Sequence, residues 1–404
     1  MGETTESLSA AEVIQSSLLE IRQRVAKQVS RDYVLDLLNA SYDYIDETGI
    51  KYIGWKEYSE IVSNIPSRDK IPSVLKSLLL LLVGDQRTHL LPVKTWIDYL
   101  QGYIDLFQTY LDLLTYSNES YVTDEELERY IYDLIPSLKA LDRLSESFHP
   151  FYTFSAVRRF LFFLDPYQQN KISIHKLVHS EVMEEFLALN RVMQLENEIG
   201  AQQVMNKLSS NWFNATNASY IYQTFLRLDV DKNGTLNIGE LLNFTGNPLE
   251  KPSLHLTSKA VRRIFEISTR QNSKEMDYKA FVDFVLIMEN KESERSKNFF
   301  WNVLNIDSIE EGGTGRITRH VIEYFYKDIA VGLVHAGCDA PLTQNVVTEI
   351  HDIMGCSVAS GIRYVDVMSS SQGHTVMLML LDINAFWAYD NRESLIPNED
   401  EAAN

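Results

Sequence analysis

The sequence predicts an all-α fold, built from tandem paired helix–loop–helix units behind a helical N-terminal region. Apolar residues recur at spacings of three and four along most of the 404-residue chain, as they do on one face of a helix. Alternation of the kind that makes strands is scarce and short. Ten prolines fall mostly between the helical stretches, where they interrupt no helix.

The first predicted helix begins after Ser9, which forms a capping box with Glu12. Ile14, Leu18 and Ile21 then lie on one face. Further helical stripes follow along the chain at 73–83, 96–114, 125–134, 155–164, 219–228, 260–267 and 299–304.

The short loops between these helices share a plan. Each has a polar stretch and one aliphatic residue, and a new helix follows. The aliphatic residues are Ile53, Leu90, Val122, Ile172, Leu236, Met276, Ile317 and Val365. A helix–loop–helix unit with one central β-type residue is an EF-hand, and such residues pair between neighbouring hands. The repeat therefore predicts EF-hand-like units in pairs.

One loop has the residues that a calcium site requires. It reads Asp229-Val-Asp231-Lys-Asn233-Gly234-Thr235-Leu236-Asn237-Ile-Gly-Glu240. Ca²⁺ prefers six to eight hard oxygen ligands, and this spacing is the EF-hand pattern. We expect side-chain oxygens from Asp229, Asp231 and Asn233, the backbone carbonyl of Thr235 and two oxygens of Glu240. Asn237 occupies the position where a bridging water is usual.

The other loops lack this set. Asp165–Lys176 begins with the right residue but ends in a lysine, and Thr115–Glu126 lacks the opening aspartate and the glycine. The loop at Thr269–Ala280 has few acceptors, and the segment between Asn305 and Ile317 is too long for a twelve-residue loop. We predict structural hands here, with weak binding at 305–317 left open through Glu310, Glu311 and Thr314.

The sequence also allows two weaker metal hypotheses. His335, Cys338, His351 and Cys356 have zinc-like spacing, but one helix over 344–354 would hold the pairs apart. His175 and His179 stand four residues apart without a third ligand nearby in the sequence. We therefore expect packed or solvent-facing side chains at both places.

Composition limits the possible partners. The 37 basic and 56 acidic residues give a net charge of −19, which disfavours nucleic acid and anionic membrane surfaces. The longest apolar runs are too short to span a bilayer, and Cys338 and Cys356 are the two cysteines, so we expect a reducing compartment and a cytoplasmic protein. The sequence lacks a nucleotide-binding glycine loop, a nucleophile elbow and an H-E-x-x-H motif, so we expect no enzyme activity.

Several longer motifs resemble a known family. They are Phe151–Pro166, Lys171–Ile174, Glu184–Leu187, Asn211–Phe213, Glu275–Val285 and Leu381–Glu393, together with the calcium loop. In this order they resemble the B″ regulatory subunits of serine/threonine protein phosphatase 2A, and their gamma-type branch, which includes the plant TONNEAU/FASS proteins.

The resemblance implies a non-catalytic subunit that binds a scaffold and a catalytic subunit of the phosphatase and directs them to substrates. It implies a role in organising centrosomes, basal bodies or cortical microtubules, and a Ca²⁺ site at Asp229–Glu240. Other B″ subunits often carry a second calcium loop where this chain has 305–317. A stand-alone calcium sensor or cytoskeletal scaffold is the alternative.

The predicted organisation has five parts. Residues 1–110 form the helical N-terminal region with degenerate EF-like units, and 111–200 a degenerate EF-hand pair. Residues 205–290 form the pair with the complete loop 229–240, 291–396 a C-terminal degenerate pair, and 397–404 an acidic tail.

Overall fold

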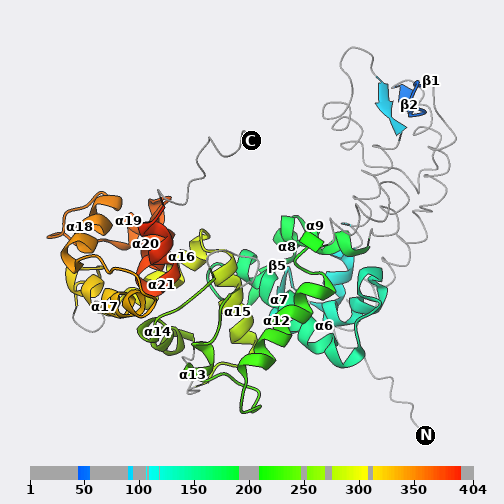
Figure 1. Ribbon diagram of the computed structural model, residues 1–404. Helices are drawn as coiled ribbons and strands as arrows, with labels where there is room; N and C mark the ends of the chain where they lie inside the picture. Colours follow the sequence, from blue (N-terminus) through cyan, green and yellow to red (C-terminus); the bar gives the residue numbers. More distant parts are fainter. Residues whose placement is uncertain are drawn as a thin grey trace, which may run out of the picture. The chain divides into compact units, whose positions relative to one another are not determined.

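The computed structural model describes residues 44–54, 90–93, 106, 109–117, 119–190, 209–246, 253–268, 275–307 and 313–392. Helices make up most of these residues and the strands are short, so the all-α prediction is confirmed (Figure 1). The predicted helices near Ser9 and at 73–83, most of 96–114, and the acidic tail lie outside the described residues. No helix of the described part is long and apolar enough to cross a membrane.

Internal contacts divide the chain into two compact units. The first comprises residues 1–130 and 170–184, and the second comprises 131–169 and 185–404. The five-part division drawn from the sequence stays a prediction.

The described part of the first unit contains two small antiparallel sheets. β1 (Tyr44–Ile45), β2 (Lys51–Gly54) and β3 (Leu90–Pro92) form an antiparallel sheet in that order. β4 (Tyr121–Thr123) pairs with β5 (Lys171–Ser173), and Val122 lies opposite Ile172 as predicted. Helix α6 (Asp124–Leu134) begins directly after β4, and α8 (Ile174–Val178) directly after β5.

The prediction that Leu90 pairs with Ile53 is wrong. Ile53 lies opposite Leu91, and Leu90 lies opposite Gly54. The shift is a single residue, which matters because successive residues of a strand face opposite ways. Ile53 is 1 % exposed, so the face that it occupies is the buried one.

Helix α9 (Glu181–Leu187) includes residues of both units, as α6 does. Three short 3₁₀ turns follow α6, η2 (Ile135–Ser137), η3 (Lys139–Leu141) and η4 (Glu146–Phe148), and η5 (Ala188–Asn190) follows α9.

In the second unit α7 (His149–Leu164) packs on α15 (Tyr278–Glu289). Two polar links join these helices. The Ser155 and Tyr278 hydroxyls lie 2.9 Å apart, and Arg158 forms a two-pronged ion pair with Asp283, whose Nε–Oδ1 distance is 2.7 Å. Burial raises the pKa of Tyr278 to about 12, so this hydroxyl stays protonated and hydrogen-bonded at neutral pH.

Two hand pairs follow in this unit. The first pair consists of α12 (Ala215–Leu228), α13 (Ile238–Leu241), α14 (Ser258–Ser268) and α15 (Tyr278–Glu289). The second consists of α16 (Glu294–Leu304), α17 (Arg319–His335), α18 (Thr343–Ile353) and α19 (Tyr364–Ser369). Helices α20 (Gly373–Leu381) and α21 (Ile383–Asp390) complete it.

Each of these pairs is joined by one β-bridge. Leu236 bridges Met276, with both N–H···O=C distances at 2.8 Å, and Ile317 bridges Ile362. All four side chains are at most 1 % exposed. The bridges therefore lie inside the hydrophobic core, which runs from Phe162 to Phe386 in this unit.

The predicted bridge residue Val365 is wrong. It lies in the first turn of α19 and is 55 % exposed, whereas Ile362 is fully buried. In both pairs the bridge residue is followed by one capping residue before the helix begins, and Arg363 is that cap here. Val365 comes three residues too late.

A third bridge, between Leu256 and Asp382, ties the segment before α14 to the turn between α20 and α21. The Thr257 amide donates to the Leu381 carbonyl at 3.0 Å, and the Ile383 amide donates to the His255 carbonyl at 3.0 Å. This bridge anchors α21 to the first hand pair of the unit.

Candidate functional site

The complete loop lies between α12 and α13, and both helix ends are fixed locally. Asp229 is the C-cap of α12, and its amide donates to the Phe225 carbonyl. At the other end Asn237 and Glu240 form a capping box: the Glu240 amide donates to the Asn237 side chain at 3.1 Å, and the Asn237 amide donates to Glu240 Oε2 at 2.9 Å. The loop therefore begins and ends at hydrogen-bonded helix termini.

Three carboxylates gather in this loop. Asp229, Asp231 and Glu240 each place an oxygen within 4.8 Å of the other two. Asp229 and Glu240 are 5 % and 6 % exposed, while Asp231 lies at the surface. No second group of three or more His, Cys, Asp or Glu side chains has this spacing in the described part of the chain.

The backbone of the loop turns sharply around these carboxylates. Gly234 has a φ of 83°, a left-handed conformation that favours glycine. The turn aims amide groups inward: the Asn233 amide donates to Asp229 Oδ1 at 3.1 Å and the Gly234 amide to Asp229 Oδ2 at 3.0 Å. These bonds compensate for part of the repulsion among the clustered negative charges.

Glu240 reaches back across the whole loop. Its Oε1 accepts from the Val230 amide at 2.8 Å, and its Oε2 accepts from the Asn237 amide. The carboxylate is thus already held at the position where it would close the site over an ion.

The described residues fit a hard cation. Every predicted donor is an oxygen, from the carboxylates of Asp229, Asp231 and Glu240, the Asn233 amide and the Thr235 carbonyl. Ca²⁺ takes six to eight such oxygens, whereas softer metals prefer nitrogen or sulfur. The donor set is therefore chemically suited to calcium, with Asp229, Asp231 and Glu240 drawn together and Asn233 and Thr235 beside them.

Glu275 is a neighbour of this loop that the sequence pattern did not predict. The Thr235 hydroxyl lies 2.6 Å from Glu275 Oε2 and 2.7 Å from Asn233 Oδ1. In the antiparallel Leu236–Met276 bridge Thr235 lies opposite Asp277, and Glu275 is its diagonal neighbour on the same face, within reach of its side chain. The signal available in the sequence was the pairing of Leu236 with Met276, whose antiparallel register puts Glu275 on the same face as Thr235.

The loop that starts at Asp165 has a cationic side chain beside it. Arg295 Nη1 donates to the carbonyls of Leu161 at 2.8 Å and Asp165 at 3.4 Å, and its guanidinium lies over the Phe162 ring. A positive charge at the C-terminus of α7 is favourable because helix carbonyls point there. Burial lowers the pKa of Arg295.

The loop after α16 is described at its two ends. The Thr314 hydroxyl donates to Asp307 Oδ2 at 2.6 Å and lowers the pKa of that carboxyl. The Gly315 amide donates to the Asp307 carbonyl at 2.7 Å. Glu310 and Glu311 lie outside the described residues, so weak binding here stays a prediction.

The weaker metal hypotheses gain no support among the described residues. Helix α18 covers most of the predicted 344–354 helix, and His351 is buried in it with its Nδ1 2.8 Å from the Val347 carbonyl. Cys338 and Cys356 are free thiols, and burial raises the pKa of Cys356. His175 and His179 stack on one another at the surface, with ring centres 4.4 Å apart.

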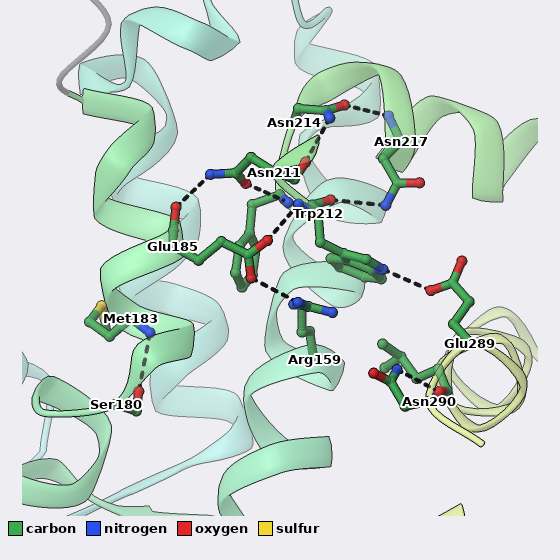
Figure 2. A network of polar contacts seen from close by, with 12 residues as sticks. Arg159, Ser180, Met183, Glu185, Asn211, Trp212, Asn214, Asn217, Glu289 and Asn290 are labelled. Carbon is green, nitrogen blue, oxygen red and sulfur yellow. Dashed lines mark hydrogen bonds and ion pairs between the residues drawn. The ribbon is translucent and has the colours of Figure 1, made fainter. Parts of the chain in front are cut away.

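A polar network fixes the segment that leads into α12 (Figure 2). Glu185 accepts from the Trp212 amide at 2.7 Å and from Arg159 at 2.7 Å, and the Arg159 guanidinium lies 4.8 Å from the Trp212 ring centre. Trp212 Nε1 donates to Glu289 on α15 at 2.9 Å. Asn211 donates to the Glu185 carbonyl at 2.6 Å. The motifs at 184–187 and 211–213 therefore link α7, α9 and α15 to the segment that precedes α12 by hydrogen bonds and an ion pair.

Comparison with known proteins gives the chain its relatives. The B″ gamma regulatory subunit of serine/threonine-protein phosphatase 2A from Xenopus tropicalis is 33 % identical over 313 residues, which cover 77 % of this chain and 65 % of that protein. The chain is a homologue of the gamma-type B″ subunits.

Other relatives are also B″ subunits. The human B″ gamma subunit is 32 % identical over 76 % of this chain and 64 % of its own length. The probable B″ subunit TON2 of Arabidopsis thaliana is 30 % identical over 74 % of this chain and 60 % of its own length. The chain thus spans less than two thirds of the length of these B″ relatives. No family model matches the chain.

A solved structure supports the fold of this B″ homologue. A chain of a PP2A PR70 holoenzyme structure superposes with a TM-score of 0.52 at 18 % identity. The match covers 67 % of this chain and 93 % of that one.

Proposed function

We propose that this chain is a non-catalytic regulatory and targeting subunit of protein phosphatase 2A. The observation that carries the proposal is the sequence similarity to B″ gamma subunits over 77 % of the chain. These relatives are named as regulatory subunits, which supports the expectation that the chain itself is not an enzyme. Its partners are then the scaffold and catalytic subunits of the phosphatase.

We further propose a cellular location and a class of partners. We place the protein in the cytoplasm and at the cytoskeleton, at centrosomes, basal bodies or cortical microtubules, with cytoskeletal or centrosomal partners. The similarity to the plant subunit TON2 supports this part, together with the resemblance to gamma-type subunits in the motif order.

The proposal assigns calcium to the loop 229–240. Asp229, Asp231, Asn233, the Thr235 carbonyl and Glu240 would hold the ion, which supplies a positive charge that neutralises the clustered carboxylates. Bound ion stabilises the folded loop by mass action, because the unfolded chain has no such cluster.

Co-purification tests the regulatory-subunit proposal. The full chain, tagged and recovered from cell extract in calcium or in chelator, should bring down the phosphatase scaffold and catalytic subunits together. If calcium regulates assembly, the yield should fall in chelator; if calcium is structural only, the yield should follow the amount of folded protein. Recovery of cytoskeletal proteins without either phosphatase subunit would favour a stand-alone sensor or scaffold instead.

A further inference from the structure

The Thr235 hydroxyl in the calcium loop has two acceptors within reach. Asn233 Oδ1 lies 2.7 Å away and Glu275 Oε2 lies 2.6 Å away. A hydroxyl carries one hydrogen and donates it to one acceptor at a time. Which of the two receives it decides what remains available for an ion.

Asn233 Oδ1 already serves another donor. The Thr235 amide donates to it at 2.8 Å. An amide oxygen has two lone pairs, so one remains for either the Thr235 hydroxyl or a metal ion. A hydroxyl bond to Asn233 therefore competes directly with calcium for this ligand.

Glu275 offers the hydroxyl the better acceptor. It is a carboxylate, and hydrogen bonds to ionised groups are about twice as strong as those between neutral groups. The antiparallel Leu236–Met276 bridge, whose side chains are fully buried, places Glu275 diagonally across from Thr235 on the same face. The partner loop thus delivers this carboxylate through the backbone.

We propose that Glu275 is a positioning residue of the calcium loop: it accepts the Thr235 hydroxyl and leaves the Asn233 side-chain oxygen free to bind the ion. This inference rests on the proposed calcium site. It gives the partner hand a role in calcium binding although its own loop has no carboxylate at positions one, three, five and twelve. Those positions hold Thr269, Gln271, Ser273 and Ala280.

The competing explanation is that the Glu275 charge attracts calcium through space, without the Thr235 hydroxyl. The positioning and charge explanations predict different results for the variants. Charge alone acts whatever stands at position 235 and is lost equally in Glu275→Gln and Glu275→Ala. Positioning needs the Thr235 hydroxyl, and the amide of Glu275→Gln still accepts its proton. Removing the hydroxyl by Thr235→Val frees Asn233 directly and keeps the Thr235 backbone carbonyl.

The test measures calcium affinity of the full chain by calorimetry, in wild type, Glu275→Ala, Glu275→Gln, Thr235→Val and the double variant Thr235→Val with Glu275→Ala. We expect Glu275→Ala to bind about tenfold more weakly, as the loss of a charged hydrogen bond predicts. Glu275→Gln should recover most of this loss. In the Thr235→Val background, adding Glu275→Ala should weaken binding by less than about twofold relative to Thr235→Val alone, a coupling that a purely structural role would not give.

Equal weakening by Glu275→Ala with and without Thr235→Val would overturn the inference in favour of charge alone. So would equal loss in Glu275→Gln and Glu275→Ala, or unchanged binding in Glu275→Ala. Wild-type protein that binds no calcium would overturn the calcium site and this inference with it. The shift of melting temperature by calcium gives an independent readout for every variant.

Discussion

Among the single residues of the loop, the Glu240 side chain has two roles. It completes the capping box of α13 and closes the loop over its carboxylate cluster. Asn237 has one role: its side chain accepts a hydrogen bond from the Glu240 amide and so caps the helix. The sequence pattern suggested a bridging water at Asn237, and the structure shows that its side chain is already engaged with the backbone.

We predict that Glu240→Gln weakens calcium binding by about tenfold or more, and that Asn237→Ala weakens it less. The first change removes one of three clustered carboxylates, whereas the second removes a cap worth about 1 kcal/mol of unfolding free energy. Calorimetry measures the affinities, and melting curves in chelator should show Asn237→Ala as the less stable variant. Equal calcium binding by Glu240→Gln and wild type would mean that the loop is not a working site.

Asp382 predicts a pH effect. Burial raises the pKa of this carboxyl above its ordinary value of 3.8, although amide hydrogen bonds from Ala385, His255 and Asn384 oppose the shift. The folded protein therefore holds the proton more tightly than the unfolded chain, and stability falls as the pH rises from 3.8 through the raised pKa. Asn at this position keeps the cap but does not titrate.

Denaturant unfolding of wild type and Asp382→Asn across that pH range measures the effect. The unfolding free energy of wild type should fall relative to the variant as the pH rises. Two curves that stay parallel would show that Asp382 has the same proton affinity in the folded and unfolded states.

The carboxylates of the loop were predictable because their geometry is local. Asp229, Asp231 and Glu240 lie in twelve consecutive residues, and the backbone path between them is set by Gly234 and the capping box. The position of Glu275 was not predictable in this way. Glu275 lies 40 residues from Thr235 in the chain, and their contact depends on the register of the bridge between the two loops.

At the level of elements, the bridge residue, one cap and the helix start form a fixed series. Leu236 is followed by Asn237 and α13, and Ile362 by Arg363 and α19. Choosing an aliphatic residue near a helix start was therefore insufficient. Counting back two residues from the first helical residue gives Ile362 in place of Val365.

This correction predicts unequal costs for two similar truncations. Ile362→Ala should lower the unfolding free energy by about 2–5 kcal/mol, because it leaves a cavity in the core. Val365→Ala should change it by less than about 0.5 kcal/mol, since that side chain is mostly in water. Equal destabilisation, measured by denaturant unfolding, would contradict the assigned bridge.

At the level of the molecule, periodicity predicts helices and their pairing with neighbours, and the bridges at Leu236–Met276 and Ile317–Ile362 follow that rule. The Leu256–Asp382 bridge does not. It joins segments more than a hundred residues apart through backbone groups that leave no mark in the sequence. The network around Trp212 is similar, because its partners Arg159, Glu185 and Glu289 come from three different helices.

The Leu236–Met276 bridge joins one loop rich in ligands to one that lacks carboxylates at positions one, three, five and twelve. A pair with a single ion has no second binding event to reinforce the first. Its occupancy then rises without cooperativity, from one tenth to nine tenths over about an 80-fold increase in free calcium. With calcium at the proposed site alone, this hand pair would respond gradually to the calcium concentration and would not switch at a threshold.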